Sequence, residues 1–320
     1  MKIPLILKPA FKDYLWGGTR LRDDFKKKCS FDKIAESWEL SCHKDGCSTI
    51  ENGDDKGMTL PEYIEKYGFE VLGTKCSGFE NFPVLIKLID AKDNLSVQVH
   101  PDNEYALKTE GEYGKTEMWY IVDCEENSSL LYGFKKSISP KEFRQRIEDN
   151  TLLEVTNNVR VKKGDVFFIK AGTLHAIGKG ILIAEIQQNS NTTYRIYDYG
   201  RKDKNGNTRE LHIDKACEVT NLNVSPELFK PKKLSFDGYS KTFLGSCDYF
   251  NSCLIDLTKK YTLTADETSF VHILILDGNM DVSSNSFSTS LTKGDSVFFP
   301  ASSGEFLLNG KCNFIITNIE

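Results

Sequence analysis

The sequence predicts a mainly β protein of two domains, each a β-sandwich or barrel, with a few helices inserted between the strands. Three observations support this prediction: short apolar runs separated by turn residues, three helix start signals, and one segment that occurs twice. A chain of 320 residues suffices for roughly two domains with buried cores.

The strands are predicted from short runs that are rich in β-branched and aromatic residues. Gly, Asp, Asn and Lys punctuate the runs, and many short strands joined by turns are typical of sandwiches and barrels. The runs cover residues 82–90, 95–99, 117–122, 165–169, 181–187, 271–276 and 296–299.

Three short helices are predicted from their start signals. Residues 59–62 (Thr-Leu-Pro-Glu) form a capping box, with Gly68 as the stop. Residues 139–142 (Ser-Pro-Lys-Glu) form another, with proline in the first helical position. Asp102 caps a short helix that we expect to run through Leu107. These helices read as insertions in a β framework.

One segment occurs twice, which favours two domains of one architecture. Residues 163–172 resemble residues 293–302, since both begin with Lys-Gly-Asp, continue into an apolar strand and end in a small-residue turn. A common hairpin explains the first part of the match but not the closing turn. We place the boundary near residues 224–227, which divides the chain into domains 1–225 and 226–320.

Charge and hydropathy exclude several classes of protein. The chain has 41 Lys+Arg against 46 Asp+Glu, a net charge of −5, so nothing favours binding to nucleic acid or to an anionic membrane. No apolar run approaches the roughly 18 residues of a membrane span. Pro4 interrupts the short apolar stretch near the start, and no small-residue cleavage site follows, so we expect no signal peptide.

The cysteines predict a reduced, cytoplasmic protein. There are nine, with no Cys-x-x-Cys pair, so neither a cysteine zinc knuckle nor a thioredoxin-like motif is supported. Scattered reduced thiols fit a cytoplasmic location.

Two strands carry polar residues of the types that ligate metals. On the first, Gln98 and His100 share one face because alternate residues point to the same side. On the second, Glu117 begins an aromatic strand and shares a face with Lys115. Taken singly, His100 also fits a buried hydrogen-bonded histidine, and Glu117 an ordinary edge charge.

A third segment places His175 after a strand and a tight turn. Its spacing from Gly164 resembles the second cupin motif, Gly-x5-Pro-x-Gly-x2-His, with Lys170 in place of proline. Gln98 and His100 stand where the first cupin motif has His-x-His, and a helical insertion precedes Glu117. Together Gln98, His100, Glu117 and His175 form one mixed nitrogen and oxygen site, which suits Zn²⁺, although Mn²⁺, Co²⁺ or Fe²⁺ use similar ligands.

The remaining histidines are predicted to be structural. In the second copy of the repeat, Glu305 stands at the position of His175, and His272 is isolated in an apolar strand, so we expect a metal-free C-terminal domain. His43 lies in a turn and His212 begins a helix, and we interpret both as structural or rim residues.

A fourth segment joins Glu185, on a strand, to Arg195 at the end of a polar stretch. We expect that stretch to leave the barrel and fold over its mouth. Arg195 then either holds an anionic oxygen or forms a surface salt bridge, and the residues alone leave both open.

Taken together, these segments resemble the type I mannose-6-phosphate isomerase family, in its short bacterial form. The resemblance covers roughly residues 1–200, and Leu-Ser-Val-Gln-Val-His-Pro-Asp at 95–102 is its most specific piece. The other matching pieces are residues 14–18, 35–38, 83–88, 115–117, 172–176 and 185–195. Glu36-Ser-Trp38 replaces the family's usual Glu-Leu-Trp, which touches no proposed ligand.

The resemblance implies two cupin-like jelly-roll domains and interconversion of mannose 6-phosphate and fructose 6-phosphate through a cis-enediol. It implies one Zn²⁺ per chain on Gln98, His100, Glu117 and His175, with Arg195 at the active site. Glu185 and Lys115 are candidates for the acid and base, and Lys87 and Arg201 for binding the phosphate. The implied partner is a small sugar phosphate, with the chain a monomer or weak homo-oligomer. Another cupin enzyme or a sugar sensor is the alternative.

Overall fold

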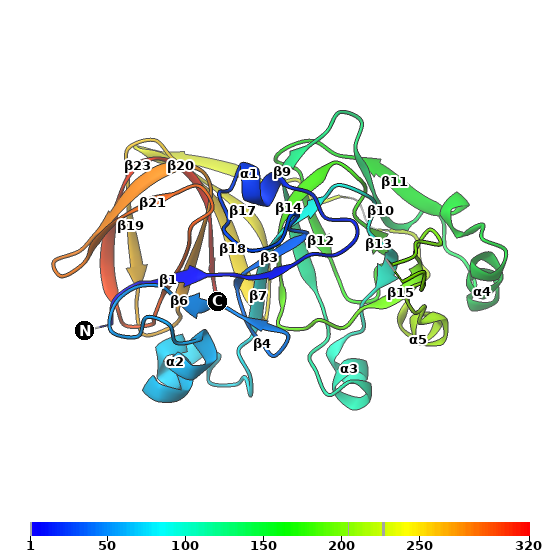
Figure 1. Ribbon diagram of the computed structural model, residues 1–320, viewed down its shortest axis with the longest axis horizontal. Coiled ribbons are helices and arrows are strands. Elements are labelled where there is room, and N and C mark those ends of the chain that lie inside the picture. Colours follow the sequence, from blue (N-terminus) through cyan, green and yellow to red (C-terminus); the bar gives the residue numbers. More distant parts are fainter. Residues whose placement is uncertain (1, 204, 226–227) are drawn as a thin grey trace.

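The computed structural model describes residues 2–203, 205–225 and 228–320, and strands dominate it. They form two β-sandwich-like lobes that lie side by side, with most helices at their margins (Figure 1). The predicted fold class is therefore confirmed.

The first lobe consists of two sheets packed face to face. The front sheet contains, in spatial order, β12 (Val166–Ile169), β9 (Glu117–Cys124), β14 (Ile181–Gln188), β7 (Val84–Ala91), β3 (Glu36–Leu40) and β2 (Ala10–Lys12). The back sheet contains β11 (Thr156–Arg160), β10 (Ser129–Phe134), β13 (His175–Ala176), β8 (Val97–Val99) and β15 (Tyr194–Tyr197). A separate small hairpin pairs β4 (Cys42–His43) with β5 (Gly46–Cys47).

Side-chain alternation along the strands divides the apolar residues of this lobe between two cores. On β14, Ile181 and Ile183 point into the space between the two sheets, whereas Leu182 and Ile186 point toward the other lobe. The strand is buried on both faces because a sheet covers each of them. The inward face also carries the polar residue Glu185, and this face forms the wall of the site described below.

The C-terminal lobe is built on one large sheet. Its main path is β16 (Lys233–Phe236), β17 (Tyr239–Cys247), β18 (Phe250–Leu257), β23 (Gly304–Asn318), β20 (Val271–Ser283), β22 (Ser296–Phe299), β1 (Leu5–Lys8) and β6 (Thr49–Ile50). In addition, β19 (Lys260–Ala265) pairs with β23, and β21 (Ser288–Thr292) pairs with β20.

The N-terminal strands cross from one lobe to the other. Leu5 of β1 is the register partner of Phe298, so the chain begins in the C-terminal sheet before it enters the front sheet of the first lobe. A division at residues 225 and 226 remains a prediction, and Pro226 and Glu227 lie outside the described residues. The N-terminal strands thus contribute to the sheets of both lobes. A single boundary along the chain cannot separate the lobes completely.

The repeated segment adopts the same turn in both lobes. Gly164 and Gly294 have φ of 91° and 95°, a conformation that glycine adopts without a steric penalty. Asp165 Oδ2 accepts from the backbone N–H three residues earlier at 2.9 Å, and Asp295 Oδ2 does the same at 2.7 Å. The Lys-Gly-Asp sequence therefore encodes one structural unit, which leads into β12 and β22.

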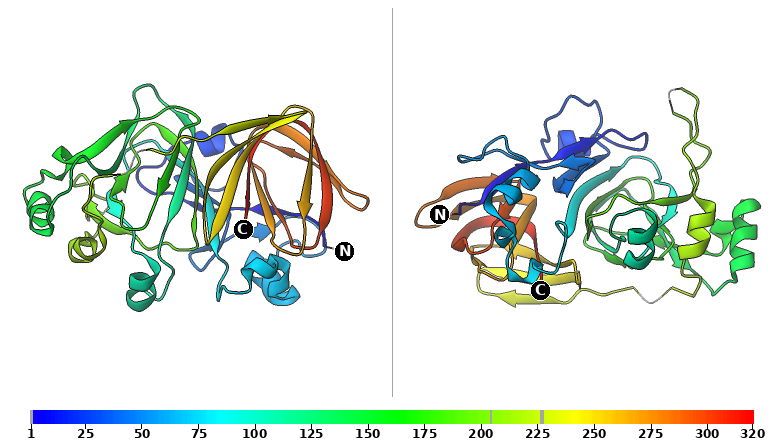
Figure 2. Two further views of the ribbon diagram at one scale, coloured as in Figure 1. Left: turned by 180° about the vertical axis from the view of Figure 1, so that it is seen from behind. Right: turned by 90° about the horizontal axis from the view of Figure 1, so that it is seen from below.

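Most helices of the described chain lie at the margins of the lobes, whereas α1 (Arg20–Asp23) lies between the two lobes (Figure 1). The others are α2 (Leu60–Tyr67), α3 (Asn103–Thr109), α4 (Pro140–Glu148) and α5 (Ile213–Val219), with single 3₁₀ turns at Phe69–Leu72, Thr74–Cys76 and Leu152–Glu154. Figure 2 shows α4 and α5 at the end of the first lobe that is remote from the C-terminal sheet. None of these described helices is long and apolar enough to span a membrane.

The three predicted helix starts are confirmed, but the capping box predicted at residues 139–142 is only half formed because Glu142 pairs with Arg146, and one helix is longer than expected. Thr59 and Glu62 form a reciprocal capping box, Ser139 accepts from the N–H of Glu142, and Asp102 accepts from the N–H of Tyr105. The helix capped by Asp102 runs to Thr109 rather than to Leu107, because no breaker occurs before Gly111.

Thr59→Ala should destabilise the protein by about 1 kcal/mol, the usual cost of losing a side-chain N-cap. The helix that Thr59 caps buries Leu60, Tyr63 and Ile64, so fraying loosens packing as well as the first turn. Urea unfolding of the two proteins measures the difference. Glu65→Ala on the same helix, at an exposed position, is the control and should stay within about 0.5 kcal/mol. Equal stability of Thr59→Ala and the control contradicts the capping argument.

Candidate metal centre and active-site cavity

Three side chains of the types that ligate metals converge between the sheets of the first lobe. His100 directly follows β8, His175 lies on β13, and Glu117 begins β9 on the opposite sheet. The Nε2 atoms of His100 and His175 lie 3.7 Å and 3.4 Å from the Glu117 carboxylate, and the ligand atoms all lie within 4.8 Å of one another. All three residues are at most 1% exposed, so water does not solvate these groups freely.

Backbone carbonyls orient both imidazole rings toward this point. His100 Nδ1 donates to Thr192 O at 2.9 Å, and His175 Nδ1 donates to Thr173 O at 2.8 Å. With the proton on Nδ1, each Nε2 presents a lone pair, and neither Nε2 has a hydrogen-bond partner among the described residues. A carbonyl on the remote nitrogen is the usual outer-shell partner of a metal-bound histidine. These unpaired buried nitrogens fit a metal ion.

Burial shifts the pKa values of the three groups toward their neutral forms. Desolvation lowers the pKa of His175 to about 4 and lowers that of His100 well below its usual value. Desolvation also raises the pKa of Glu117. Neutral imidazole is the form that ligates a metal, and a divalent cation offsets the cost of burying the carboxylate.

A row of alternating charges extends from Glu117 along the inward face of the front sheet. Lys115 Nζ lies 3.0 Å from Glu117 and 4.0 Å from Glu185, and Lys87 Nζ lies 3.3 Å from Glu185 and 3.6 Å from Glu36. The indole of Trp119 donates to Glu185 Oε1 at 2.9 Å. Three carboxylates and two ammonium groups leave one negative charge on this row.

Lys115 and Lys87 keep Glu185 ionised. Burial alone would raise the pKa of Glu185, but the two ammonium groups outweigh burial and lower that pKa to about 2. Glu117 and Glu185 therefore differ in proton affinity although both are buried carboxylates.

A cavity of about 300 Å³ opens beside these groups. Gln98 contributes to its wall, and its register partners on the neighbouring strands are His175 and Arg195. The lining residues are Tyr14, Trp16, Glu36, Lys87, Ile89, Leu95, Ser96, Gln98, Lys115, Ile177, Glu185, Asn191, Thr193, Arg195 and Arg209.

Arg195 lies on a strand and not on a flap over the mouth. It belongs to β15, at the edge of the back sheet, where pairing with β8 holds it beside Gln98. The expectation that its segment leaves the barrel was therefore wrong, because the backbone of Tyr194–Tyr197 finds partners on β8. On the other side, the N–H of His212, at the N-terminus of α5, donates to the Arg195 carbonyl at 2.7 Å, and the Arg195 N–H donates to His212 Nδ1 at 3.2 Å.

The guanidinium of Arg195 has no carboxylate partner among the described ion pairs. Nη1 donates to the carbonyl oxygen of Glu210 at 2.8 Å, and Nε is buried without a hydrogen bond. Burial and the neighbouring Arg209 lower the pKa of Arg195. This unneutralised charge at the cavity wall suits an anion better than a structural salt bridge.

Two further arginines lie next to Arg195 and share one carboxylate. Arg201 and Arg209 both bond to Asp198, and Arg209, but not Arg201, reaches the cavity. The sequence reasoning missed Arg209, because nothing in its local sequence distinguishes it from a surface arginine. The structure also places Lys87 deep between two carboxylates, so nearby negative charge already compensates this predicted phosphate-binding residue.

The other histidines lie outside the cluster formed by His100, Glu117 and His175. His272 is buried in β20, and its Nε2 contacts Ser296 Oγ at 2.8 Å. His43 lies on the small hairpin, 3.5 Å from Glu112. A second cavity, of about 430 Å³, borders His43 and Glu112, and its lining includes none of His100, Glu117 and His175.

Two family descriptions match the chain. Residues 5–130 match the phosphomannose isomerase type I catalytic domain, and residues 239–319 match the mannose-6-phosphate isomerase cupin domain.

Relatives from two bacteria match over the full length. The mannose-6-phosphate isomerase ManA of Bacillus subtilis is 39% identical over 317 residues, covering 99% of both chains. The mannose-6-phosphate isomerase of Streptococcus mutans is 37% identical over 326 residues, with 99% coverage of both. The crystal structure of the mannose 6-phosphate isomerase from Bacillus subtilis superposes with a TM-score of 0.92 at 36% identity, over all of both chains.

Proposed function

The chain belongs to the type I phosphomannose isomerase family, and from that premise we propose that it interconverts mannose 6-phosphate and fructose 6-phosphate with a zinc ion bound to His100, Glu117 and His175. The single observation that carries this proposal is the pair of buried Nε2 lone pairs that face Glu117 beside a polar cavity. The family membership supports the isomerase activity.

The residues at the site fit a divalent ion, and zinc suits them best. Two neutral imidazoles and a carboxylate are common ligands of catalytic Zn²⁺, and such sites keep a further position open. Gln98 is our proposed fourth ligand, since its strand neighbour is His175 and its side chain borders the cavity. When bound, the ion supplies Lewis acidity that polarises the substrate oxygens at carbons 1 and 2.

We propose that Glu185 and Lys115 carry out the proton transfers. An aldose–ketose isomerase moves a proton between carbons 1 and 2 through a cis-enediol, so it needs a base at carbon and an acid at oxygen. Glu185 is ionised, and Lys115 Nζ lies 4.0 Å from its Oε2. Both side chains line the cavity, so one substrate contacts both.

We propose that the basic residues of the cavity bind the phosphate and the other anionic oxygens of the substrate. Arg195 and Arg209 line it directly, and Arg201 holds Asp198, which orients Arg209. Lys87 also borders the cavity, where it keeps Glu185 ionised as well as contacting substrate. These groups give a net negative chain the local positive charge that a phosphate ester requires.

Removal of the metal should abolish isomerisation reversibly. Incubation with a chelator should eliminate turnover of mannose 6-phosphate, and stoichiometric Zn²⁺ should restore it, because the apo site lacks the positive charge that stabilises the reacting oxygens. A coupled assay with metal analysis on the same samples, followed by addition of Zn²⁺, Mn²⁺, Co²⁺ or Fe²⁺ singly, measures this. The midpoint of thermal unfolding should fall on chelation, since metal binding stabilises the folded state.

The same experiment separates the alternatives. Full turnover by metal-free protein contradicts the metal role, and restoration by Fe²⁺ but not Zn²⁺ contradicts the choice of zinc. Metal binding without turnover of mannose 6-phosphate points instead to another cupin enzyme or to a sugar sensor.

A further inference from the structure

The loop at residues 189–193 connects the two halves of the proposed active site. It joins β14, which carries Glu185, to β15, which carries Arg195. Its Thr192 carbonyl accepts the hydrogen bond that orients His100, at 2.9 Å, while Asn191 and Thr193 line the substrate cavity. The position of this loop therefore affects both the metal ligand and the cavity wall.

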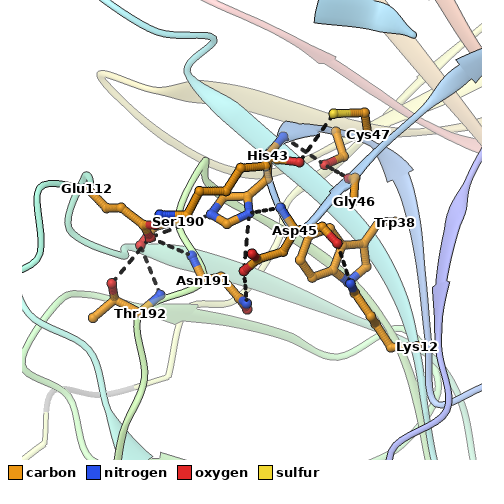
Figure 3. Close-up of polar contacts among 12 residues, drawn as sticks. Lys12, Trp38, His43, Asp45, Gly46, Cys47, Glu112, Ser190, Asn191 and Thr192 are labelled. Carbon is orange, nitrogen blue, oxygen red and sulfur yellow. Dashed lines mark hydrogen bonds and ion pairs between the residues drawn. The ribbon is translucent and has the colours of Figure 1, made fainter.

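The loop is held from outside by residues that are distant in sequence. Asp45, in the small hairpin, accepts from Asn191 Nδ2 at 2.8 Å. Glu112, in the segment after α3, accepts from the Asn191 N–H and the Thr192 hydroxyl, both at 3.5 Å (Figure 3). Two carboxylates from separate segments thus fix two successive residues of the loop.

Hairpin side chains hold Glu112 in turn. Lys44 Nζ lies 2.6 Å from Glu112 Oε1, and His43 Nε2 lies 3.5 Å from Oε2. His43 Nδ1 accepts from the Asp45 N–H at 3.1 Å, so the neutral ring carries its proton on Nε2, toward Glu112 (Figure 3). The carboxylate is only 18% exposed on its side chain, which limits the competition from water.

We propose that Glu112 and Asp45 are positioning residues for the metal centre: by holding Asn191 and Thr192, they set the carbonyl that orients His100. His43 and Lys44 support Glu112 and touch neither substrate nor metal. The inference rests on the proposed function, because it requires that His100 bind a metal. A direct hydrogen-bond partner of a histidine ligand, as Thr192 is here, typically contributes about 10- to 100-fold in metal affinity, and Glu112 and Asp45 act one contact further from the ligand.

The test compares zinc affinity in four variants of the full chain. Glu112→Ala removes both loop contacts, Glu112→Gln keeps an oxygen that accepts from them, and Asp45→Ala removes the contact to Asn191. Asp45 is 44% exposed on its side chain, so its variant should fold even if Glu112→Ala does not. Glu142→Ala is the matched control, since it breaks a surface ion pair to Arg146 at 2.9 Å on α4, away from the site.

Competition with a chelator measures the dissociation constant of Zn²⁺ for each protein, with thermal midpoints recorded in parallel. The visible spectrum of the Co²⁺-substituted protein reports ligand geometry independently of turnover. We expect Glu112→Ala and Asp45→Ala to weaken zinc binding by about 10-fold and to change the Co²⁺ spectrum. Glu112→Gln should recover most of the affinity, and Glu142→Ala should equal the unmodified protein.

Zinc affinities of Glu112→Ala and Asp45→Ala that match the control overturn the inference, whatever their thermal midpoints. A lowered midpoint with unchanged affinity and spectrum means that the contacts are merely structural. If the unmodified protein itself binds no zinc, the proposed function fails together with this inference. If it binds zinc and isomerises the substrate while the variants do likewise, the inference alone fails.

Discussion

His175→Ala should lose stoichiometric zinc and should lower kcat/KM for mannose 6-phosphate on the order of 1,000-fold. Metal ions supply several kcal/mol of charge stabilisation in the transition state, and about 1.4 kcal/mol corresponds to a factor of ten in rate. His175 is fully buried with its Nε2 lone pair 3.4 Å from Glu117, so alanine removes one ligand that no other described side chain replaces. Metal analysis of the purified variant and a coupled assay measure the two effects.

A matched histidine in the other lobe distinguishes ligand loss from the loss of any buried imidazole. His272 is also fully buried, and its ring contacts Ser296 instead of Glu117. His272→Ala should retain zinc and turnover even if its thermal midpoint falls. A chelator should lower the midpoint of the unmodified protein but not that of His175→Ala. Stoichiometric zinc in His175→Ala removes this residue from the ligand set, and an anomalous signal near His272 refutes a metal-free C-terminal domain.

Arg195→Ala should lower kcat by about 100- to 1,000-fold with little change in KM, the usual cost of losing a preorganised donor to a developing negative charge. Nε is buried without a hydrogen bond, and no carboxylate partner is present among the described ion pairs, so the guanidinium has donors free for substrate. Since pairing of β15 with β8 fixes the strand, the donor is in place before the reaction. Steady-state kinetics of the variant separate kcat from KM.

The changes in kcat and KM also distinguish a catalytic role of Arg195 from a role in binding phosphate. A raised KM with normal kcat means that Arg195 binds phosphate in the ground state, and the catalytic assignment is then wrong. Zinc content should stay unchanged, because a guanidinium is not a ligand. Arg144→Ala is the control, since it removes an exposed arginine that pairs with Asp214 at 2.8 Å outside the cavity. Loss of activity in both variants indicates a general effect on folding.

Much of the fold and of the metal centre is encoded locally and was predicted from the sequence. Strand alternation places Gln98 and His100 on the face opposite Val97 and Val99, and the structure confirms that the two valines pack against the helical side of the back sheet. The capping residues mark helix starts because each capping side chain and its backbone partner lie three residues apart. In the same way, the Lys-Gly-Asp turn forms identically in both lobes.

Sequence alone therefore determined the family, the β architecture and the residues of the candidate metal site, since each of these depends on spacing within a short segment. Only the tertiary structure decided which loops meet at the site. It brought Arg209 to the cavity, placed Arg195 on an edge strand and set the Thr192 carbonyl against His100, 92 positions away in the chain. It also joined β1 to the C-terminal sheet. Local periodicity tells which face a side chain occupies, but a contact between distant segments depends on how whole sheets pack, which no short stretch of sequence encodes.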